Sequence, residues 1–191
     1  MTVNVRGARP GDGSAIARMW LSAAAYYAGL DPARFQVPAA EGLAGLFENG
    51  IPRGGGDVLQ LVAEFDGRVV GWLSARVQRP DQDAGVELAR EHGWTRLMVE
   101  VLIVDGGQWR RGAGTALLER AESWGRDQGA EVVRLGTYAH SPVAVGFYEQ
   151  HMGYTRRAII FQKRLRSSGP QQPQNRHRPA ASGGGGRDQD T

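Results

Sequence analysis

The amino-acid sequence predicts one mixed α/β sheet, mostly antiparallel, with helices flanking it. Segments with strand character alternate with amphipathic helical segments over residues 3–165. The dipeptide Asp66-Gly67 separates two apolar runs, which indicates a hairpin of antiparallel strands. The second half of the chain alternates strand and helix signals, as expected for crossovers between strands of one sheet. The expected order of elements is therefore β-α-α-β-β-β-α-β-α-β.

The N-terminal part is predicted to form a short strand and two helices. Val3 and Val5 alternate with polar residues, as in a strand. Asp12 or Ser14 can cap the first helix, because both side chains can accept hydrogen bonds from the free N–H groups of a first turn. The apolar stripe of that helix consists of Ile16, Met19, Trp20, Ala23 and Tyr27. A second helix is expected over residues 39–48.

The remaining elements are predicted from apolar runs and from the residues that interrupt them. Strands are expected over residues 58–65, 68–77, 96–104, 131–137 and 154–165. The third of these is apolar on both faces, which is typical of a central strand. A helix is expected from Gly112 onward, and another begins at Ser141, which suits an N-cap and precedes Pro142. The loop 79–93 is polar, and its part 85–91 has helical character.

The composition is that of a globular protein without cysteine chemistry. Of the 191 residues, 41% are apolar and 23% are charged. The chain has no cysteine, which excludes disulfides, thiolate metal sites and cysteine nucleophiles, and a cytoplasmic location is expected. No run approaches the roughly 20 apolar residues of a membrane span. Early charges at Arg6, Arg9 and Asp12 do not suit a secretory signal.

Neither the net positive charge nor the C-terminal residues indicate a particular binding partner. The net charge is +3, but the arginines are scattered among acidic residues, so nucleic-acid binding is not favoured. Residues 167–191 lack apolar periodicity and contain a run of glycines, which predicts a disordered tail. The alternative is a nucleic-acid-associated protein that uses this basic tail.

The segment before the helix at Gly112 has the composition of a phosphate site. It reads Trp109-Arg110-Arg111-Gly112-Ala113-Gly114-Thr115. Glycines let the backbone turn sharply, and the first N–H groups of a helix have no internal partner, so they can bind phosphate. Two arginines add positive charge. The alternative is a tight strand–helix turn packed for its own sake; neither a P-loop lysine nor a three-glycine dinucleotide fingerprint is present.

In its context this segment resembles the acetyl-CoA motif of the GNAT superfamily of N-acyltransferases, whose pattern is Arg/Gln-x-x-Gly-x-Gly/Ala. Three other segments resemble the family in the same order. Residues 5–12 are similar to its opening strand and turn, 66–71 to its second hairpin, and 144–154 to its closing helix and strand. The resemblance implies the GNAT acyl-CoA N-acyltransferase fold, with an N-acetyltransferase domain over residues 1–166.

The chain departs from the family pattern at three points. Trp109 stands at the Arg/Gln position. Ser141 stands where an asparagine often begins the closing helix. One additional residue lies between Tyr148 and Gly153. The departures concern contacts with the cofactor and the geometry of the helix end.

The resemblance implies acetyl-CoA as the co-substrate, and no metal. The pantetheine arm would pair with the backbone at the end of the central strand, and the pyrophosphate would lie on the glycine loop. The implied cofactor-binding residues are Leu102, Ile103, Val104, Trp109, Arg110, Arg111, Gly112, Ala113, Gly114, Thr115, Ser141 and Tyr148.

The reaction that the resemblance implies is attack of a neutral amine on the thioester carbonyl. It needs a base, a donor for the oxyanion and an acid for the leaving thiolate. Tyr148 stands where the family's helix tyrosine approaches the thioester sulfur, so it is the expected acid; the alternative is a core aromatic. A backbone N–H near Leu102 is the expected oxyanion donor.

Glu100 is the expected base, acting through water. It is the only charged residue within the apolar run 97–104, where a charge needs water, a partner or a function. The alternative is a salt bridge, for instance with Arg96 or Arg134. His140 and His151 are weaker candidates for the base.

The acceptor is an amine of unidentified kind. The side chains expected around it are the aromatic Tyr26, Tyr27, Phe35 and Phe47 and the acidic Asp81, Asp83, Glu87 and Glu91. The acidic residues would favour a cationic amine, unless they form only a solvated loop. Candidate acceptors are a small amine, an aminoglycoside-like polyamine, an amino acid, or a protein N-terminus or lysine. The other functional class is a non-catalytic acyl-CoA-binding sensor, and a homodimer is compatible with the fold.

Overall fold

The computed structural model describes residues 2–51, 56–80, 84–86 and 88–163. The chain divides into two units, Met1–Arg156 and Arg157–Thr191. Every helix and strand of the described chain lies in the first unit. In the second unit, residues 157–163 are exposed and have no regular secondary structure.

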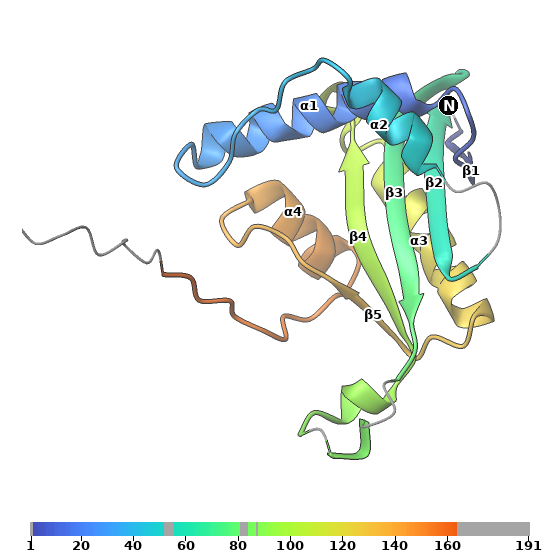
Figure 1. The fold of residues 1–191 in the computed structure, drawn as a ribbon, viewed down its shortest axis with the longest axis vertical. Coiled ribbons are helices and arrows are strands. Elements are labelled where there is room, and N and C mark those ends of the chain that lie inside the picture. The colour runs from blue at the N-terminus through green and yellow to red at the C-terminus, as the bar shows by residue number, and fades with distance from the viewer. Residues whose placement is uncertain (1, 52–55, 81–83, 87, 164–191) are drawn as a thin grey trace, which may run out of the picture. The chain divides into compact units, whose positions relative to one another are not determined.

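The first unit is built on one five-stranded sheet, in the order β1-β2-β3-β4-β5 (Figure 1). Its strands are β1 (Asn4–Gly7), β2 (Val58–Phe65), β3 (Arg68–Gln78), β4 (Arg96–Val104) and β5 (Val132–Leu135). Neighbours from β1 to β4 are antiparallel, whereas β5 runs parallel to β4. The prediction of a mixed, mostly antiparallel sheet is confirmed.

Helices cover both faces of this sheet (Figure 1). They are α1 (Gly13–Leu30), α2 (Leu43–Gly50), α3 (Ala113–Asp127) and α4 (Pro142–Gly146), and α4 continues as a π-helical turn over Phe147–His151. Short 3-10 turns occur at Ala84–Val86, Arg90–Gly93 and Gly106–Gln108. No helix in the described ranges is long and apolar enough to cross a membrane.

Each face of the sheet has its own apolar core, because side chains alternate between the faces along a strand. On one face, Leu117 and Leu118 of α3 are completely buried against Leu73 of β3. On the other face, the first half of α1 packs against Val62 and Trp72. The two cores hold α1 and α3 on opposite sides of β3 and β4, and the ends of these helices border the candidate site.

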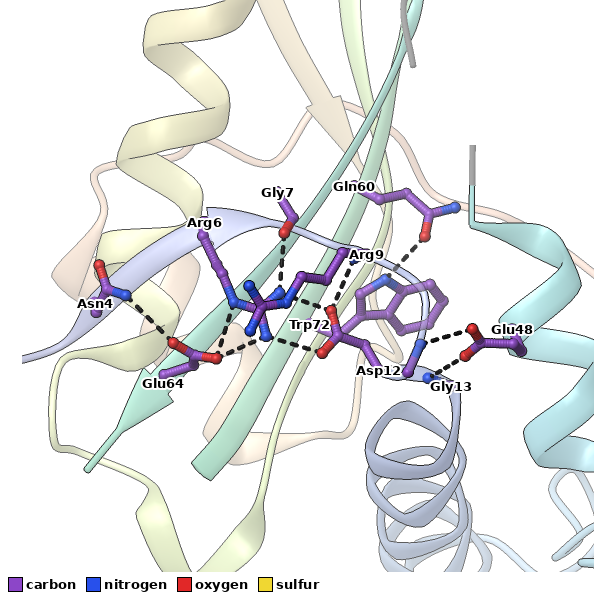
Figure 2. Close-up of polar contacts among 11 residues, drawn as sticks. Asn4, Arg6, Gly7, Arg9, Asp12, Gly13, Glu48, Gln60, Glu64 and Trp72 are labelled. Carbon is purple, nitrogen blue, oxygen red and sulfur yellow. Dashed lines mark hydrogen bonds and ion pairs between the residues drawn. The ribbon is translucent and has the colours of Figure 1, made fainter. Parts of the chain in front are cut away.

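An ionic network fixes the chain that leads into α1 (Figure 2). The Arg6 guanidinium donates to both carboxylate oxygens of Asp12, at 2.7 and 2.9 Å, and its Nε donates to Glu64 at 2.9 Å. The Arg9 backbone N–H donates to the Asp12 carboxylate at 2.8 Å. Burial tends to raise the pKa of Asp12, but these hydrogen bonds outweigh it and hold the pKa below its ordinary value of 3.8. The hydrogen bond from Arg6 likewise lowers the pKa of Glu64.

The predicted side-chain cap of the first helix is wrong. Asp12 occupies the N-cap position, but its carboxylate is taken by Arg6 and makes no cap hydrogen bond. Glu48 of α2 supplies acceptors instead, receiving the N–H groups of Gly11 at 2.6 Å and Gly13 at 3.0 Å (Figure 2). The capping partner is 35 residues away in sequence from Gly13, beyond the reach of a local pattern.

Some predicted boundaries are also shifted. The second helix begins at Leu43 instead of residue 39, because Gly42 adopts a left-handed φ of 73° that ends the preceding loop. The fifth strand spans Val132–Leu135, shorter than the expected 131–137. The helical character expected within 85–91 appears as two 3-10 turns, and residue 87 lies outside the described residues.

The expected last strand, 154–165, is wrong over the residues that the structure describes. Residues 154–163 have no regular secondary structure, and Ile159, Ile160 and Phe161 are 81–90% exposed. Their β-branched and aromatic character favours a strand, but a strand also needs a neighbouring backbone, which no local pattern guarantees. Residues 164–165 and the predicted tail 167–191 lie outside the described residues, so the domain boundary at residue 166 stays a prediction.

Candidate functional site

The site lies where β4 separates from β5. The parallel pairing of these strands runs from Arg96 opposite Val132 to Val99 opposite Leu135 and stops there. On its other edge, β4 stays paired with β3 as far as Val104. Among the described strands, none pairs with residues 101–104 on the β5 side. This edge therefore offers backbone N–H and C=O groups to an extended ligand, and it includes the predicted Leu102, Ile103 and Val104.

A β-bulge marks the point of separation. Ser74 pairs with Val101 and Ala75 pairs with Val99, so Glu100 is the additional residue on β4. Bulges bend a strand and re-aim side chains, and they are frequent beside active sites. Here the bulge directs the strand end away from β5 and leaves Glu100 exposed.

Glu100 forms an ion pair with Arg76, whose Nε is 2.7 Å from its carboxylate oxygen. The salt-bridge alternative is therefore observed, but with a partner other than the two arginines named from sequence. Arg134 pairs with Glu91 at 3.5 Å, and Arg96 is buried with no hydrogen-bond partner for its Nε in the described part of the chain. Both side chains of the Arg76–Glu100 pair are almost half exposed, so water reaches the carboxylate.

The loop between β4 and α3 adopts the strained geometry of a ligand-binding turn. Arg110 has a φ of 61° and Gly112 a φ of 86°, both in the left-handed region. A left-handed conformation is rare for a residue other than glycine, and such residues cluster at ligand sites. Left-handed residues of this kind occur in the backbone nests that bind anions.

The N-terminus of α3 completes this cradle. The first hydrogen bond of the helix runs from the Ala116 N–H to the Gly112 carbonyl, so the N–H groups of residues 113–115 have no partner within the helix. A side chain at Gly114 would lie 3.4 Å from Phe147 and 3.6 Å from Val104. These are ordinary contact distances, so the helix start packs against both the strand end and the π-helical turn. We call residues 110–115 the phosphate cradle.

The two arginines of the cradle have different surroundings. Arg111 lies with its guanidinium carbon 4.8 Å from the centre of the Phe65 ring and donates to Gln108. It borders a cavity of about 270 Å³ beside the β2–β3 hairpin. Arg110 is exposed at the left-handed turn.

Trp109 closes the end of β4. Its indole Nε1 donates to the Val104 carbonyl oxygen at 2.8 Å, and its ring packs edge-on against Tyr26 of α1, with centroids 5.2 Å apart. The family pattern places a polar side chain here. In this chain the position instead joins the cradle to α1.

Tyr148 lies in the π-helical turn, partly buried between Phe147 and Tyr154. Burial, and in second place the nearness of Tyr27, raises the pKa of Tyr148 to about 12. The phenol is therefore protonated at neutral pH. Its hydroxyl has no hydrogen-bond partner among the described residues, which leaves the proton available to a ligand.

Ser141 caps α4 as predicted, accepting from the Ala144 N–H at 3.3 Å. It is completely buried, and its oxygen also lies 3.3 Å from the Tyr26 hydroxyl. The oxygen is thus already engaged by the Ala144 N–H and the Tyr26 hydroxyl. The predicted cofactor contact of Ser141 stays a prediction.

The two histidines lie in different parts of the site. His151 is 3.0 Å from Thr115 of the cradle, measured from Nε2 to the hydroxyl oxygen. His140 packs edge-on against Tyr138, with ring centroids 5.3 Å apart.

The aromatic residues expected around the acceptor separate into two groups. Tyr26, Tyr27 and Phe35 lie together, with ring centroids 5.2–5.3 Å apart between neighbours. Phe47 instead packs on Trp72 in the core between α1 and the sheet and does not join that group. Asp81, Asp83 and Glu87 lie outside the described residues, and Glu91 is held by Arg134.

Sequence reasoning missed Tyr138, which belongs to the aromatic group, and Asp31, which accepts its hydrogen bond. The Tyr138 ring lies 5.0 Å from Phe35, and its hydroxyl donates to the Asp31 carboxylate at 2.8 Å. This hydrogen bond raises the pKa of Tyr138. The pair is separated by 107 residues, so no local signal could have found it. We call Tyr26, Tyr27, Phe35 and Tyr138 the aromatic wall.

Comparison with known proteins agrees with this architecture. Residues 26–154 match the sequence model of the Acetyltransferase (GNAT) family, which is more than half of the 191-residue chain. The chain belongs to this family. GNAT proteins are acetyltransferases that generally use acetyl-CoA. No curated protein sequence matches the chain.

Solved structures share the GNAT fold at low sequence identity. A transcriptional regulator from Bacillus halodurans is 21% identical, with a TM-score of 0.63, covering 86% of this chain and 100% of its own. A Trypanosoma brucei acetyltransferase is 22% identical, with a TM-score of 0.56, covering 87% and 100%. An aminoglycoside acetyltransferase from a soil metagenomic sample, solved with sisomicin, is 17% identical, with a TM-score of 0.54, covering 86% and 97%. At these identities the likeness establishes the GNAT fold.

The described residues were also considered as metal ligands. No group of three or more His, Asp or Glu side chains there is placed to hold a metal ion. What the described residues offer at the candidate site is an open strand edge, a glycine-rich helix start, a protonated phenol and a solvated carboxylate.

Proposed function

We propose that this protein transfers the acetyl group of acetyl-CoA to a primary amine by direct attack within a ternary complex. The observation that supports it most is the junction at the end of β4. There, the unpaired edge of residues 101–104 meets the phosphate cradle, and both features suit one extended, phosphorylated ligand. When bound, acetyl-CoA supplies the thioester that the amine attacks.

The cradle would hold the pyrophosphate through backbone N–H groups of Gly112 to Thr115. These groups have no partner within the helix, and the dipole of α3 places partial positive charge at the same point. The pantetheine arm would follow Leu102, Ile103 and Val104 as an added strand. The Trp109 indole already occupies the Val104 carbonyl oxygen, so the arm would pair with the remaining groups of that edge.

Tyr148 is assigned as the acid. Its raised pKa, about 12, keeps the phenol protonated, and the hydroxyl is free to donate to a leaving thiolate. A backbone N–H near Leu102 is assigned to the oxyanion. Tyr27 of the aromatic wall is the second cause of the raised pKa of Tyr148, which supports an acceptor position between the wall and the acid.

Glu100 is assigned as the base that removes the ammonium proton through water. Its carboxylate is exposed on the bulge, close to the point where β4 opens. Arg76 competes for this carboxylate. The ion pair supports the alternative function, a non-catalytic acyl-CoA-binding module in which Glu100 stays paired with Arg76 and removes no proton.

The acceptor is assigned to the space beside the aromatic wall. Aromatic rings favour apolar or cationic groups, and Asp31 adds a carboxylate at the C-terminal end of α1. A small amine or an aminoglycoside-like polyamine suits this chemistry, and one protein of the same fold is an aminoglycoside acetyltransferase. The amino acid and the protein N-terminus or lysine are the other candidates. The cytoplasmic location and the homodimer stay predictions.

An acceptor screen tests the function. The purified protein is incubated with acetyl-CoA and a panel of amines, and release of free thiol is measured. We expect amine-dependent release that falls in both Tyr148→Phe and Glu100→Gln. Release that neither substitution slows would overturn the assignment of these residues. A protein that binds CoA but releases no thiol with any amine would favour the non-catalytic module.

A further inference from the structure

His151 reaches the phosphate cradle from the other side of the site. Its Nε2 lies 3.0 Å from the hydroxyl oxygen of Thr115, although the two residues are 36 positions apart. Its ring also stacks on Phe147, with centroids 5.9 Å apart and planes inclined by 28°. Phe147 in turn packs against Gly114. The imidazole is therefore held by a hydrogen bond and by a ring that itself touches the cradle.

The π-helical turn explains how this histidine arrives there. The chain has one residue more than the GNAT pattern between Tyr148 and Gly153, and the turn over Phe147–His151 accommodates it. The Met152 N–H donates to the Phe147 carbonyl at 3.0 Å, which closes a turn wider than that of an α-helix. Single π turns inside helices are frequent at functional sites. The additional residue thus lies in the same stretch of chain as the contact between His151 and Thr115.

Thr115 has a single hydroxyl proton, and its direction decides what the cradle can bind. The hydroxyl can donate to Nε2, to a carbonyl of the preceding turn, or outward into the cradle. If the His151 Nε2–H donates to the Thr115 oxygen, the Thr115 hydroxyl cannot donate to Nε2, and its proton is free for a ligand. An outward O–H then joins the N–H groups of residues 113–115.

We propose that His151 is a positioning residue for the cofactor. Its Nε2–H donates to the Thr115 hydroxyl and turns the hydroxyl proton toward the pyrophosphate of the acyl-CoA. This inference rests on the function proposed above, since it names a determinant of the same cofactor site. His151 itself touches neither the thioester nor the amine.

The test compares acetyl-CoA with S-acetylpantetheine, which carries the same thioester without the pyrophosphate. His151→Leu removes the donor, whereas His151→Gln keeps an N–H donor on a side chain of similar reach. We expect His151→Leu to lower kcat/KM for acetyl-CoA by about tenfold and to leave kcat/KM for S-acetylpantetheine within about twofold. His151→Gln should restore most of the loss with acetyl-CoA.

A double-mutant cycle shows whether the effect passes through Thr115. Thr115→Val should lower kcat/KM for acetyl-CoA by a similar factor, and adding His151→Leu to it should cause no further loss. If His151→Leu lowers kcat/KM equally for acetyl-CoA and for S-acetylpantetheine, His151 only supports the fold. If the losses of the two single variants add fully in the double variant, His151 does not act on Thr115. Either result overturns the inference.

Binding separates this inference from the proposed function. The same variants are heated with CoA and with pantetheine, which needs no turnover. We expect His151→Leu to lose most of the stabilisation by CoA, and His151→Gln to keep it. If CoA stabilises the wild type and His151→Leu equally, the inference is overturned and the proposed function is not. A wild type that CoA does not stabilise would overturn both.

Discussion

The indole Nε1 of Trp109 donates a hydrogen bond of 2.8 Å to the carbonyl oxygen of Val104. This contact joins the loop that begins the phosphate cradle to the last residue of β4. The same ring rests edge-on against Tyr26 of α1, so one side chain connects the cradle, the strand end and the helix that carries the aromatic wall. A position that departs from the GNAT pattern has thus become structural in this chain.

Trp109→Phe should separate the hydrogen bond from the ring packing. The phenyl ring can still pack against Tyr26, but the Val104 carbonyl loses its partner. We expect the free energy of unfolding to fall by about 1 kcal/mol, measured by urea denaturation. An unchanged midpoint and slope would show that water replaces the indole without cost.

Arg6→Leu should destabilise the entry to α1. It leaves Asp12, which is only 6% exposed, as a carboxylate without its cationic partner. Removing one partner of a buried ion pair typically costs about 3–5 kcal/mol, and we expect a loss near 3 kcal/mol because Arg6 is partly exposed. The control is Arg79→Leu, which breaks an exposed pair with Asp57 and should cost under about 1 kcal/mol. Equal losses in the two variants would contradict this account.

The same network predicts a loss of stability in acid. The folded pKa values of Asp12 and Glu64 lie below their ordinary values of 3.8 and 4.5. Their contribution is therefore fully present above these ordinary values and is lost as the pH falls through the lower folded values. We expect the free energy of unfolding to decrease between pH 5 and pH 3, and to decrease less in Arg6→Leu. A steeper decrease in the variant would reverse the sign and refute the assignment.

Tyr148→Phe should lower kcat while leaving the fold intact. The substitution removes only a hydroxyl without a described partner, and general acids contribute about 10²–10⁴-fold. The matched control is Tyr154→Phe, which also removes a hydroxyl from this group of rings, one bonded to Glu122 at 2.7 Å. We expect a loss of about a hundredfold in the first variant and within about threefold in the second, measured by thiol release with a saturating amine.

The pKa of Tyr148 adds a pH signature to that comparison. A value of about 12 keeps the acid protonated through the whole alkaline range in which most enzymes can be assayed. The wild-type rate should therefore show no fall caused by Tyr148 up to about pH 10, where an ordinary tyrosine would be half ionised. A fall near pH 10 that disappears in Tyr148→Phe would contradict the raised pKa.

The parts of the fold that depend on local patterns could be predicted from the sequence. The Asp66-Gly67 turn lies between strands whose boundaries match within a residue, because left-handed φ values at both positions are a local requirement. The apolar run of β4 was found at its full length, 96–104. The strand expected over residues 154–165 does not form in the described residues, because a strand needs a backbone partner that lies far away in sequence.

The candidate site divides in the same way. The glycine turn and the helix start at Ala113 were predictable because they are adjacent in sequence; their binding of phosphate stays a prediction. The contacts of Trp109 with Tyr26, of Tyr138 with Asp31 and of His151 with Thr115 were not, because each joins elements far apart in the chain. The additional residue before Gly153 was visible in the sequence, but the π-helical turn that accommodates it is a property of the packing around Phe147.

Equilibrium binding of acetyl-CoA tests the central claim most directly, by titration calorimetry and by thermal unfolding. We predict one site per chain and a stabilisation of about 2.7 kcal/mol at a hundred times Kd. Gly112→Ala should weaken binding, because the left-handed turn of the cradle is strained by a Cβ. Gly129→Ala, at a left-handed glycine beyond the other end of α3, should bind as the wild type does. No heat and no stabilisation at saturating acetyl-CoA, or equal weakening in both variants, would contradict the account.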